Sequence, residues 1–247
     1  MAHSKVAIVT GGTLGIGFAV SKSLLEDPDG GWEVYILYHS SPYKVSQALP
    51  RAHLKQADVT SWQSLSKAFS DVFEETGRLD FVFANAGVLF TTDFFADMTG
   101  NTIEPIDMSP VDYASQFAPV YSATKAGVVH FMRSIAKPLF QTHGVRVHAI
   151  CPGAVHTTLV SSAVWAAFPI ESFISVKDIV AVVRHLMSDQ PLIDSAGRRI
   201  ALESKFGLAV EVGTTGLYIR DEQKFSDPVA QSSLAVLSML EESTTEE

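Results

Sequence analysis

The chain has 247 residues, of which 47% are hydrophobic, and its formal net charge at neutral pH is −9. This length and hydrophobicity predict one α/β domain with a large buried core. The negative charge argues against nucleic acid or an anionic membrane surface as the main partner.

Three other sequence features narrow the class of protein. The single cysteine, Cys151, excludes an intramolecular disulfide and fits a reducing compartment, so we expect a cytoplasmic location. No apolar run is long enough to span a bilayer, and the first residues are too polar for a secretory signal. The eight histidines lack the spacing of metal ligands, so we expect no metal.

The N-terminal segment has the pattern of a dinucleotide-binding loop. Residues 6–9 form a short apolar, β-branched run that predicts a buried parallel strand. The glycine-rich stretch 10–17 comes next and leads into a helical pattern. Glycines let the backbone approach a pyrophosphate, and a helix N-terminus favours its negative charge. The alternative is a glycine turn that only links the strand to the helix.

Strands and helices then alternate, which predicts a parallel doubly wound sheet with ligands beyond the carboxyl ends of its strands. Residues 60–63 predict a capping box in front of a helix, and residues 81–83 a strand buried on both faces. The other expected strands are residues 34–37, 52–57, 145–150 and, as the last strand, 199–202. Further helices are expected at residues 122–140 and 176–187.

Tyr121 and Lys125 are four residues apart on a predicted helix and therefore share one face. A phenol with its ordinary pKa of about 10 is a poor acid or base at neutral pH. A nearby ammonium stabilises the phenolate and lowers that pKa. The pair therefore suits proton transfer to or from an alcohol or ketone oxygen. By itself the spacing also fits a core tyrosine beside a solvated lysine.

Together these motifs resemble the classical short-chain dehydrogenase/reductase family. The order along the chain is that of the family, and the motifs span most of residues 5–160. A weaker resemblance, to the branch similar to 15-hydroxyprostaglandin dehydrogenases, is suggested by residues 83–87 and 149–153. The matching motifs are Thr10-Gly11-x-x-x-Gly15-x-Gly17, Asp58-Val59, Asn85-Ala86-Gly87, Tyr121-x-x-x-Lys125 and Pro152-Gly153 with Thr157.

The resemblance implies a Rossmann-like fold and hydride transfer between NAD or NADP and an apolar secondary alcohol or ketone. It implies Tyr121 as acid and base, Lys125 as its partner and a serine that holds the substrate oxygen. The residues it implies for cofactor binding are Thr10, Gly11, Gly15, Ile16, Gly17, Tyr38, Asp58, Val59, Asn85, Ala86, Gly87, Tyr121, Lys125, Pro152, Gly153, Val155 and Thr157.

The interval between Gly87 and Tyr121 departs from the family, because it holds only 33 residues. One βαβ unit needs roughly 30 residues, and prolines 105, 110 and 119 suit neither a helix interior nor a central strand. We therefore expect that the helix and strand that normally precede the catalytic tyrosine are missing. Asp112-Tyr113 has the character of a junction where a segment is absent.

The family's catalytic asparagine and serine would lie in the same interval. Asn85 and Asn101 are the only asparagines, and Asn85 is assigned to the cofactor, so the family's catalytic asparagine is expected to be absent. Ser109 lies twelve residues before Tyr121, close to the family spacing, and is the candidate catalytic hydroxyl. A different alignment favours Ser115, and a loop or cap serine is the alternative for Ser109.

The choice between NAD and NADP depends on the turn after the second strand, Tyr38-His39-Ser40. It has no carboxylate to bind a ribose diol or repel a phosphate. His39 could contact a phosphate when protonated, and Lys44 is another candidate. The sequence therefore leans slightly to NADP.

We predict a single domain, residues 1–247, with a motif-bearing core at 5–160, a substrate lid and last strand at 161–204, and a divergent extension with an acidic tail at 205–247. Leu217 to Ile219 predict an added strand. Two interpretations fit Val164, Trp165, Phe168 and Phe173 equally well. They could form the wall of a substrate pocket, or they could be ordinary packing residues of a covering helix.

Function and assembly stay open at this stage. An active reductase of lipids, terpenoids or polyketides, as in secondary metabolism, is the first hypothesis. A nucleotide-binding protein without turnover and a truncated, non-functional product are the alternatives. The family often pairs subunits through the helices beside the interval between Gly87 and Tyr121. The resemblance therefore makes a homo-oligomer the candidate assembly.

Overall fold

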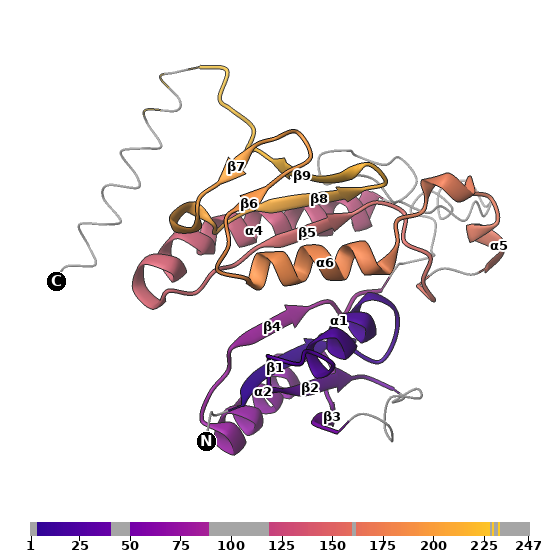
Figure 1. The fold of residues 1–247 in the computed structure, drawn as a ribbon, viewed down its shortest axis with the longest axis vertical. Coiled ribbons are helices and arrows are strands. Elements are labelled where there is room, and N and C mark those ends of the chain that lie inside the picture. Colours follow the sequence, from indigo (N-terminus) through magenta and orange to yellow (C-terminus); the bar gives the residue numbers. More distant parts are fainter. Residues whose placement is uncertain are drawn as a thin grey trace.

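The computed structural model describes residues 4–40, 50–88, 119–159 and 162–227, together with Val229 and Ser232. Its first part is a four-stranded parallel sheet of order β3-β2-β1-β4 (Figure 1). The strands are β1 (Lys5–Thr10), β2 (Trp32–Tyr38), β3 (Ala52–Gln56) and β4 (Phe81–Ala84). The four strands predicted in this region are therefore confirmed.

Helices cover both faces of this first sheet, as the alternating pattern predicts. Helix α1 (Gly15–Leu25) buries Val20 and Leu24 against one face of β1 and β2. Helix α2 (Trp62–Thr76) buries Ala68 and Val72 against the other. The expected capping box at residues 60–63 is shifted by one position, since Ser61 is the N-cap and its hydroxyl accepts from the Ser64 N–H.

The second part is a three-stranded sheet of order β5-β8-β9. Strand β5 (Ala149–Pro152) pairs in parallel with β8 (Ala209–Gly213), which forms an antiparallel hairpin with β9 (Gly216–Arg220). Helix α4 (Pro119–His143) covers one face and α6 (Val176–Met187) the other (Figure 1). The added strand predicted at residues 217–219 is confirmed as β9.

Short elements connect these parts, and one of them corrects the sequence analysis. Residues 199–202 are not the last strand: β7 (Arg199–Ile200) only pairs with β6 (Leu192–Ile193), and β8 and β9 follow it. The pattern at 199–202 is too short to specify a sheet, whereas β8 gains parallel pairing from β5. The other elements are α5 (Ser162–Trp165) and the 3₁₀ turns Ile170–Ser172 and Leu202–Ser204.

The two sheets do not join through strand pairing in the part of the chain that the structure describes. There, β4 pairs with β1 and β5 pairs with β8, and each has an unpaired second edge. Residues 81–83 were expected to be buried on both faces, and this is wrong: Val82 is 40% exposed, and Phe81 and Phe83 are half-buried. An apolar strand needs neighbours to bury it, and here it lies at a sheet edge. The helix and strand expected to be missing before Tyr121 lie outside the described residues.

Packing between α1 and α6 connects the two parts. Val183 of α6 belongs to the same buried cluster as Val20 and Leu24 of α1. Arg184 beside it forms an ion pair with Asp27, just after α1. The hydrogen bond from the Arg184 guanidinium lowers the pKa of the Asp27 carboxyl. Apolar burial and a partly buried charge pair therefore hold the two sheets together.

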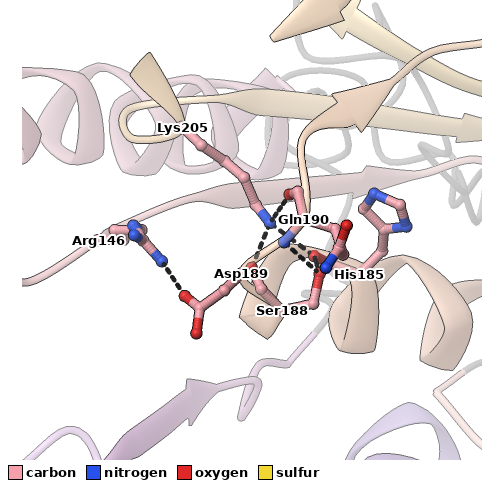
Figure 2. A network of polar contacts seen from close by, with 6 residues as sticks. All are labelled: Arg146, His185, Ser188, Asp189, Gln190 and Lys205. Atoms are coloured by element: carbon pink, nitrogen blue, oxygen red, sulfur yellow. Dashed lines mark hydrogen bonds and ion pairs between the residues drawn. The ribbon is translucent and has the colours of Figure 1, made fainter. Parts of the chain in front are cut away.

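A buried lysine fixes the C-terminal end of α6 (Figure 2). Lys205 is fully buried, and its ammonium donates to the carbonyls of His185, Ser188 and Gln190 at 2.8, 2.6 and 2.8 Å. The last carbonyls of a helix lack partners within the helix, and a cation suits the negative end of its dipole. Lys205 therefore ties the approach to β8 to the end of α6.

His148 lies close to this network, just before β5. Neither of its buried ring nitrogens has a hydrogen-bond partner among the residues described. Burial lowers the pKa of the imidazole from 6.5 to about 4, and the positive charges of Lys205 and Arg146 add to this shift. The folded protein therefore holds His148 in its neutral form above about pH 4.

We predict that Lys205→Met lowers the free energy of unfolding by about 2–4 kcal/mol, because it keeps the apolar stem and leaves three carbonyls without their donor. Urea unfolding followed by circular dichroism measures this loss. Lys177→Met, which changes an exposed lysine of α6, the helix whose end Lys205 binds, should have little effect. Equal effects of the two substitutions would contradict the assigned role of Lys205.

We also predict that acidification destabilises the protein through His148. The unfolded chain takes up a proton near pH 6.5 and the folded chain only near pH 4, so stability should fall as the pH drops through this window. This difference in pKa between the unfolded and folded chain corresponds to about 3 kcal/mol of unfolding free energy. Urea unfolding at several pH values should show this loss in the wild type and a smaller one in His148→Leu. Identical pH profiles would exclude His148 as the source.

Candidate active site

The candidate site begins with the loop between β1 and α1. Gly11 and Gly15 have φ angles of 62° and 56°, which is the left-handed region that favours glycine. Leu14 is the N-cap of α1 and gives no side-chain hydrogen bond to the N–H groups of the first turn. Those donors and the positive end of the helix dipole suit a phosphate.

Asn85 connects this loop to the end of β4. Its side-chain amide donates to the carbonyls of Thr10 and Gly11 at 3.2 and 3.3 Å. In return, the Thr10 hydroxyl accepts from the backbone N–H groups of Asn85 and Ala86, each at 3.0 Å. These four bonds fix the carboxyl ends of β1 and β4 side by side, where the sequence motifs predict the cofactor.

The glycines of the loop are needed for close packing. A Cβ atom on Gly17 would lie 2.5 Å from the Gly11 carbonyl oxygen and 2.6 Å from the Asn85 amide nitrogen. A Cβ on Gly11 would lie 3.1 Å from the Ala86 Cα. The backbone therefore approaches closely at this point, and the loop has a structural reason to exclude side chains.

Tyr121 and Lys125 lie on the first turns of α4, as predicted. The Lys125 ammonium is 5.2 Å from the centre of the Tyr121 ring. The same ammonium lies 3.5 Å from the position of a Cβ on Gly87, the residue that follows the Asn85-Ala86 pair. Lys125 therefore brings the candidate acid–base pair to the end of β4.

The segment after β5 closes the other side of the loop. The Gly153 N–H donates to Val212 at 3.0 Å, and Val155 is buried in the core under α6. A Cβ on Gly15 would lie 3.5 Å from Thr157. The Thr157 carbonyl accepts from the Trp165 indole at 2.7 Å, a contact that no sequence motif predicts. Thr157 thus contacts both the glycine loop and the segment expected to cover the substrate.

Four aromatic side chains gather on that covering segment. Trp165 is buried, with its ring centre 5.5 Å from His156, 5.7 Å from Phe168 and 5.5 Å from Phe173. The Phe168 and Phe173 rings keep exposed area, so they present an apolar surface in addition to packing on Trp165. The expected role of the Val164 side chain lies outside the described residues.

The remaining predicted positions lie at the ends of β2 and β3. Tyr38 is the last residue of β2, and its carbonyl accepts from the Ala57 N–H at 2.9 Å. Asp58 accepts from the Thr60 N–H and hydroxyl at 2.9 and 2.7 Å, which lowers the pKa of its carboxyl. Val59 is partly exposed beside it, and Ile16 packs in the core at the start of α1.

The structure thus brings the predicted glycine loop, Asn85, Lys125 and Thr157 into one connected site. Ser109, Ser115, Asn101 and Lys44 lie outside the described residues. Within the described part of the chain, no helix is long and apolar enough to cross a membrane.

Comparison with known proteins gives a consistent family. A family model described as short chain dehydrogenase matches residues 5–106 and 110–166. The short-chain dehydrogenase/reductase prx7 of Penicillium rubens is 36% identical over 263 residues, covering 86% of this chain and 92% of that protein. The 15-hydroxyprostaglandin dehydrogenase (NAD(+)) of Homo sapiens is 30% identical over 190 residues, covering 65% of this chain and 71% of that protein.

The fold is also similar to that of solved structures. A short chain dehydrogenase from Burkholderia cenocepacia in complex with NADP has a TM-score of 0.65 and 22% identity. The match covers 86% of this chain and 97% of that one.

The alignments also bear on the short interval before Tyr121. The alignment with the Penicillium rubens protein spans 263 residues, more than the 247 of this chain, so that protein has residues without a counterpart in this chain. The two stretches of the family match are separated at residues 107–109, inside the same interval.

We predict that Gly17→Ala weakens the glycine loop, because the new Cβ would displace the Gly11 carbonyl and the Asn85 amide. Nicotinamide dinucleotide affinity should fall by about tenfold or more, and the unfolding midpoint should fall with it. The matched control is Gly127→Ala on α4, where a Cβ meets no atom within 4 Å. Unchanged affinity in Gly17→Ala would show that close approach at this point is not required.

Proposed function

The chain belongs to the short-chain dehydrogenase family, and from this premise we propose that it is an NAD(P)-dependent oxidoreductase interconverting a secondary alcohol and a ketone on an apolar small molecule. The observation that carries the proposal is the bonded junction between β1 and β4. There, Asn85 holds the glycine loop at a spacing that leaves no room for a Cβ on Gly17.

The cofactor assignment fits the chemistry of this junction. Gly11, Gly15 and Gly17 would let the backbone reach the pyrophosphate, at the uncapped N-terminus of α1. Asp58 and Val59 would hold the adenine end, and Asn85, Lys125 and Thr157 the nicotinamide end. When bound, the dinucleotide supplies or accepts the hydride. Similar proteins include one named for NAD(+) and one solved in complex with NADP. The sequence of the turn after β2 slightly favours NADP.

Tyr121 is proposed as the general acid in ketone reduction and the general base in alcohol oxidation. In reduction its hydroxyl would give a proton to the substrate oxygen, and in oxidation the phenolate would take that proton back. Lys125 approaches the Tyr121 ring and would stabilise the phenolate that forms. Ser109, or Ser115 in its place, would hold the substrate oxygen.

The proposed substrate class rests on the aromatic group after β5. Trp165 is anchored to Thr157, and Phe168 and Phe173 keep exposed area beside it. Half-exposed aromatic faces suit a hydrophobic substrate such as a lipid, terpenoid or polyketide of secondary metabolism.

Three broader predictions remain proposals. A cytoplasmic location rests on the single cysteine, and a homo-oligomer on family resemblance. We also propose a core at residues 5–160, a lid at 161–204 and an extension at 205–247. In the structure, β8 of the extension pairs with β5 of the core.

Two other functions have support of their own. A nucleotide-binding protein without turnover is favoured by the contrast between the bonded loop and the second edges of β4 and β5, to which no strand pairs among the described residues. A truncated, non-functional product is favoured by the residues of the Penicillium rubens protein that this chain lacks. Sequencing the transcript around Asp112 would detect an omitted in-frame segment.

We predict that the purified protein binds NADPH or NADH saturably in a fluorescence titration and reduces apolar ketones. Tyr121→Phe should keep cofactor affinity and lose turnover by about 10²–10⁴-fold, because the proton donor is removed. The control is Tyr218→Phe, which changes a tyrosine of β9 whose hydroxyl bonds Thr215.

Each outcome separates the candidates. Full turnover in Tyr121→Phe would contradict the proposed role of Tyr121 as the proton donor. Cofactor binding with no turnover in the wild type, over a panel of ketones and alcohols, would favour the nucleotide-binding alternative. Absence of binding to either cofactor would favour the truncated product.

A further inference from the structure

Thr157 lies beyond the end of β5, where strand pairing no longer holds the backbone. The strand ends at Pro152, and the N–H of the next residue, Gly153, still donates to the Val212 carbonyl of β8 at 3.0 Å. Thr157 comes four residues later, in a bend. Backbone groups outside a strand ladder must find their hydrogen-bond partners elsewhere. The position of Thr157 therefore depends on contacts with side chains.

Trp165 supplies such a contact. Its indole N–H donates to the Thr157 carbonyl at 2.7 Å, and only 4% of the residue is exposed. The indole packs against the rings of His156, Phe168 and Phe173, with centres 5.5, 5.7 and 5.5 Å from its own. A ring enclosed in this way holds its N–H in one direction, and a buried indole N–H needs an acceptor. The cluster therefore aims one donor at one carbonyl.

A second bond ties the same region to the core. The Ile174 N–H, just after the aromatic cluster, donates to the Ala154 carbonyl at 2.7 Å. Ile174 itself is buried with the residues that pack under α6. Ala154 is thus held from the core, and Thr157 is held by the indole of Trp165. The aromatic cluster and residues 154–157 therefore form one bonded unit.

The Thr157 side chain lies against the glycine loop. A Cβ on Gly15 would lie 3.5 Å from both its Cβ and its Cγ2, so the carbon side of Thr157 faces the start of α1. Its hydroxyl accepts from the Leu159 N–H at 3.3 Å, which leaves the hydroxyl proton available to an acceptor. A shift of the Thr157 backbone would move this donor relative to the loop, and misplacement of about 1 Å is enough to weaken a site.

We propose that Trp165 is a positioning residue for the cofactor: its indole N–H holds the Thr157 carbonyl and so sets the Thr157 hydroxyl beside the glycine loop. The inference rests on the proposed function, which places the nicotinamide end of the cofactor at Thr157. Trp165 acts through Thr157. Phe168 packs on the same indole but carries no donor for the Thr157 carbonyl, so its role is confined to the apolar surface.

The test is a titration of the full chain with NADPH and with NADH, followed by direct excitation of the nicotinamide so that loss of an indole does not change the signal. Trp165→Phe keeps an aromatic ring and removes the donor, and cofactor affinity should fall about five- to tenfold. The matched control is Phe168→Leu, which disturbs the same cluster and keeps the donor. Its cofactor affinity should stay within about twofold of the wild type.

A second replacement separates the hydrogen bond from packing. Benzothienylalanine at position 165 has sulfur in place of the indole N–H, so it keeps the shape of the ring and removes only the donor. It should lose as much cofactor affinity as Trp165→Phe. Circular dichroism and urea unfolding check that every variant is folded, and the isostere keeps the test valid if the smaller ring of phenylalanine loosens the cluster.

Hydrogen exchange of the indole N–H gives a readout on the unmodified chain. The chain has three tryptophans, and the Trp165 signal in a nuclear magnetic resonance spectrum is assigned by its loss in Trp165→Phe. If the bond supports the cofactor, the cofactor must support the bond, because coupling is reciprocal. Exchange at Trp165 should therefore slow on cofactor binding more than at Trp32, which lies in the core of the first sheet and reports general stabilisation.

The unfavourable outcomes are distinguishable. Unchanged cofactor affinity in both Trp165 replacements, or equal losses in the isostere and Phe168→Leu, would overturn the positioning role and leave the proposed function intact. Equal slowing of exchange at Trp165 and Trp32 would also contradict that role. Absence of binding of either cofactor to the wild type would overturn the proposed function and this inference together.

Discussion

The contact between α1 and α6 is the interaction on which the rest of the structure depends. The two sheets share no strand pair in the described residues, so Val183 against Val20 and Leu24, with the Arg184–Asp27 pair beside it, is what connects them. Burial of apolar surface supplies most of such an attachment, and a partly exposed ion pair adds direction more than free energy. The proposed site draws residues from both parts, so its geometry rests on this helix contact.

The two sheets contribute different groups to the candidate site. The first contains a closed set of bonds between Thr10, Gly11 and Asn85 that is local to β1 and β4. The second brings Thr157 beside the loop, and the Thr157 carbonyl holds the Trp165 indole. Among the described residues, β4 pairs with β1 alone and β5 pairs with β8 alone, and Val82 keeps exposed apolar area.

Buried and exposed basic groups have opposite uses here. Lys205 is enclosed and bonded to three carbonyls, so its charge fixes the end of α6. His148 is held neutral beside it, because burial and two cations oppose its protonation. His39, by contrast, is exposed, and its imidazole lies 4.0 Å from the Asp58 carboxylate. Solvent access, more than residue type, separates a structural base from one that can recognise an anion.

The sequence by itself determined the features that depend on local pattern. The strands of the first sheet, the glycine loop after β1 and the helical spacing of Tyr121 and Lys125 all follow from short-range periodicity and glycine geometry. Only the tertiary structure decided features that depend on a distant neighbour. Phe81 to Phe83 is apolar enough for a central strand, yet its burial depends on a strand beside it. β8 became a sheet strand through pairing with β5, and His39 met Asp58 through the register of β2 and β3. Such contacts join residues far apart in the chain, and no local pattern records them.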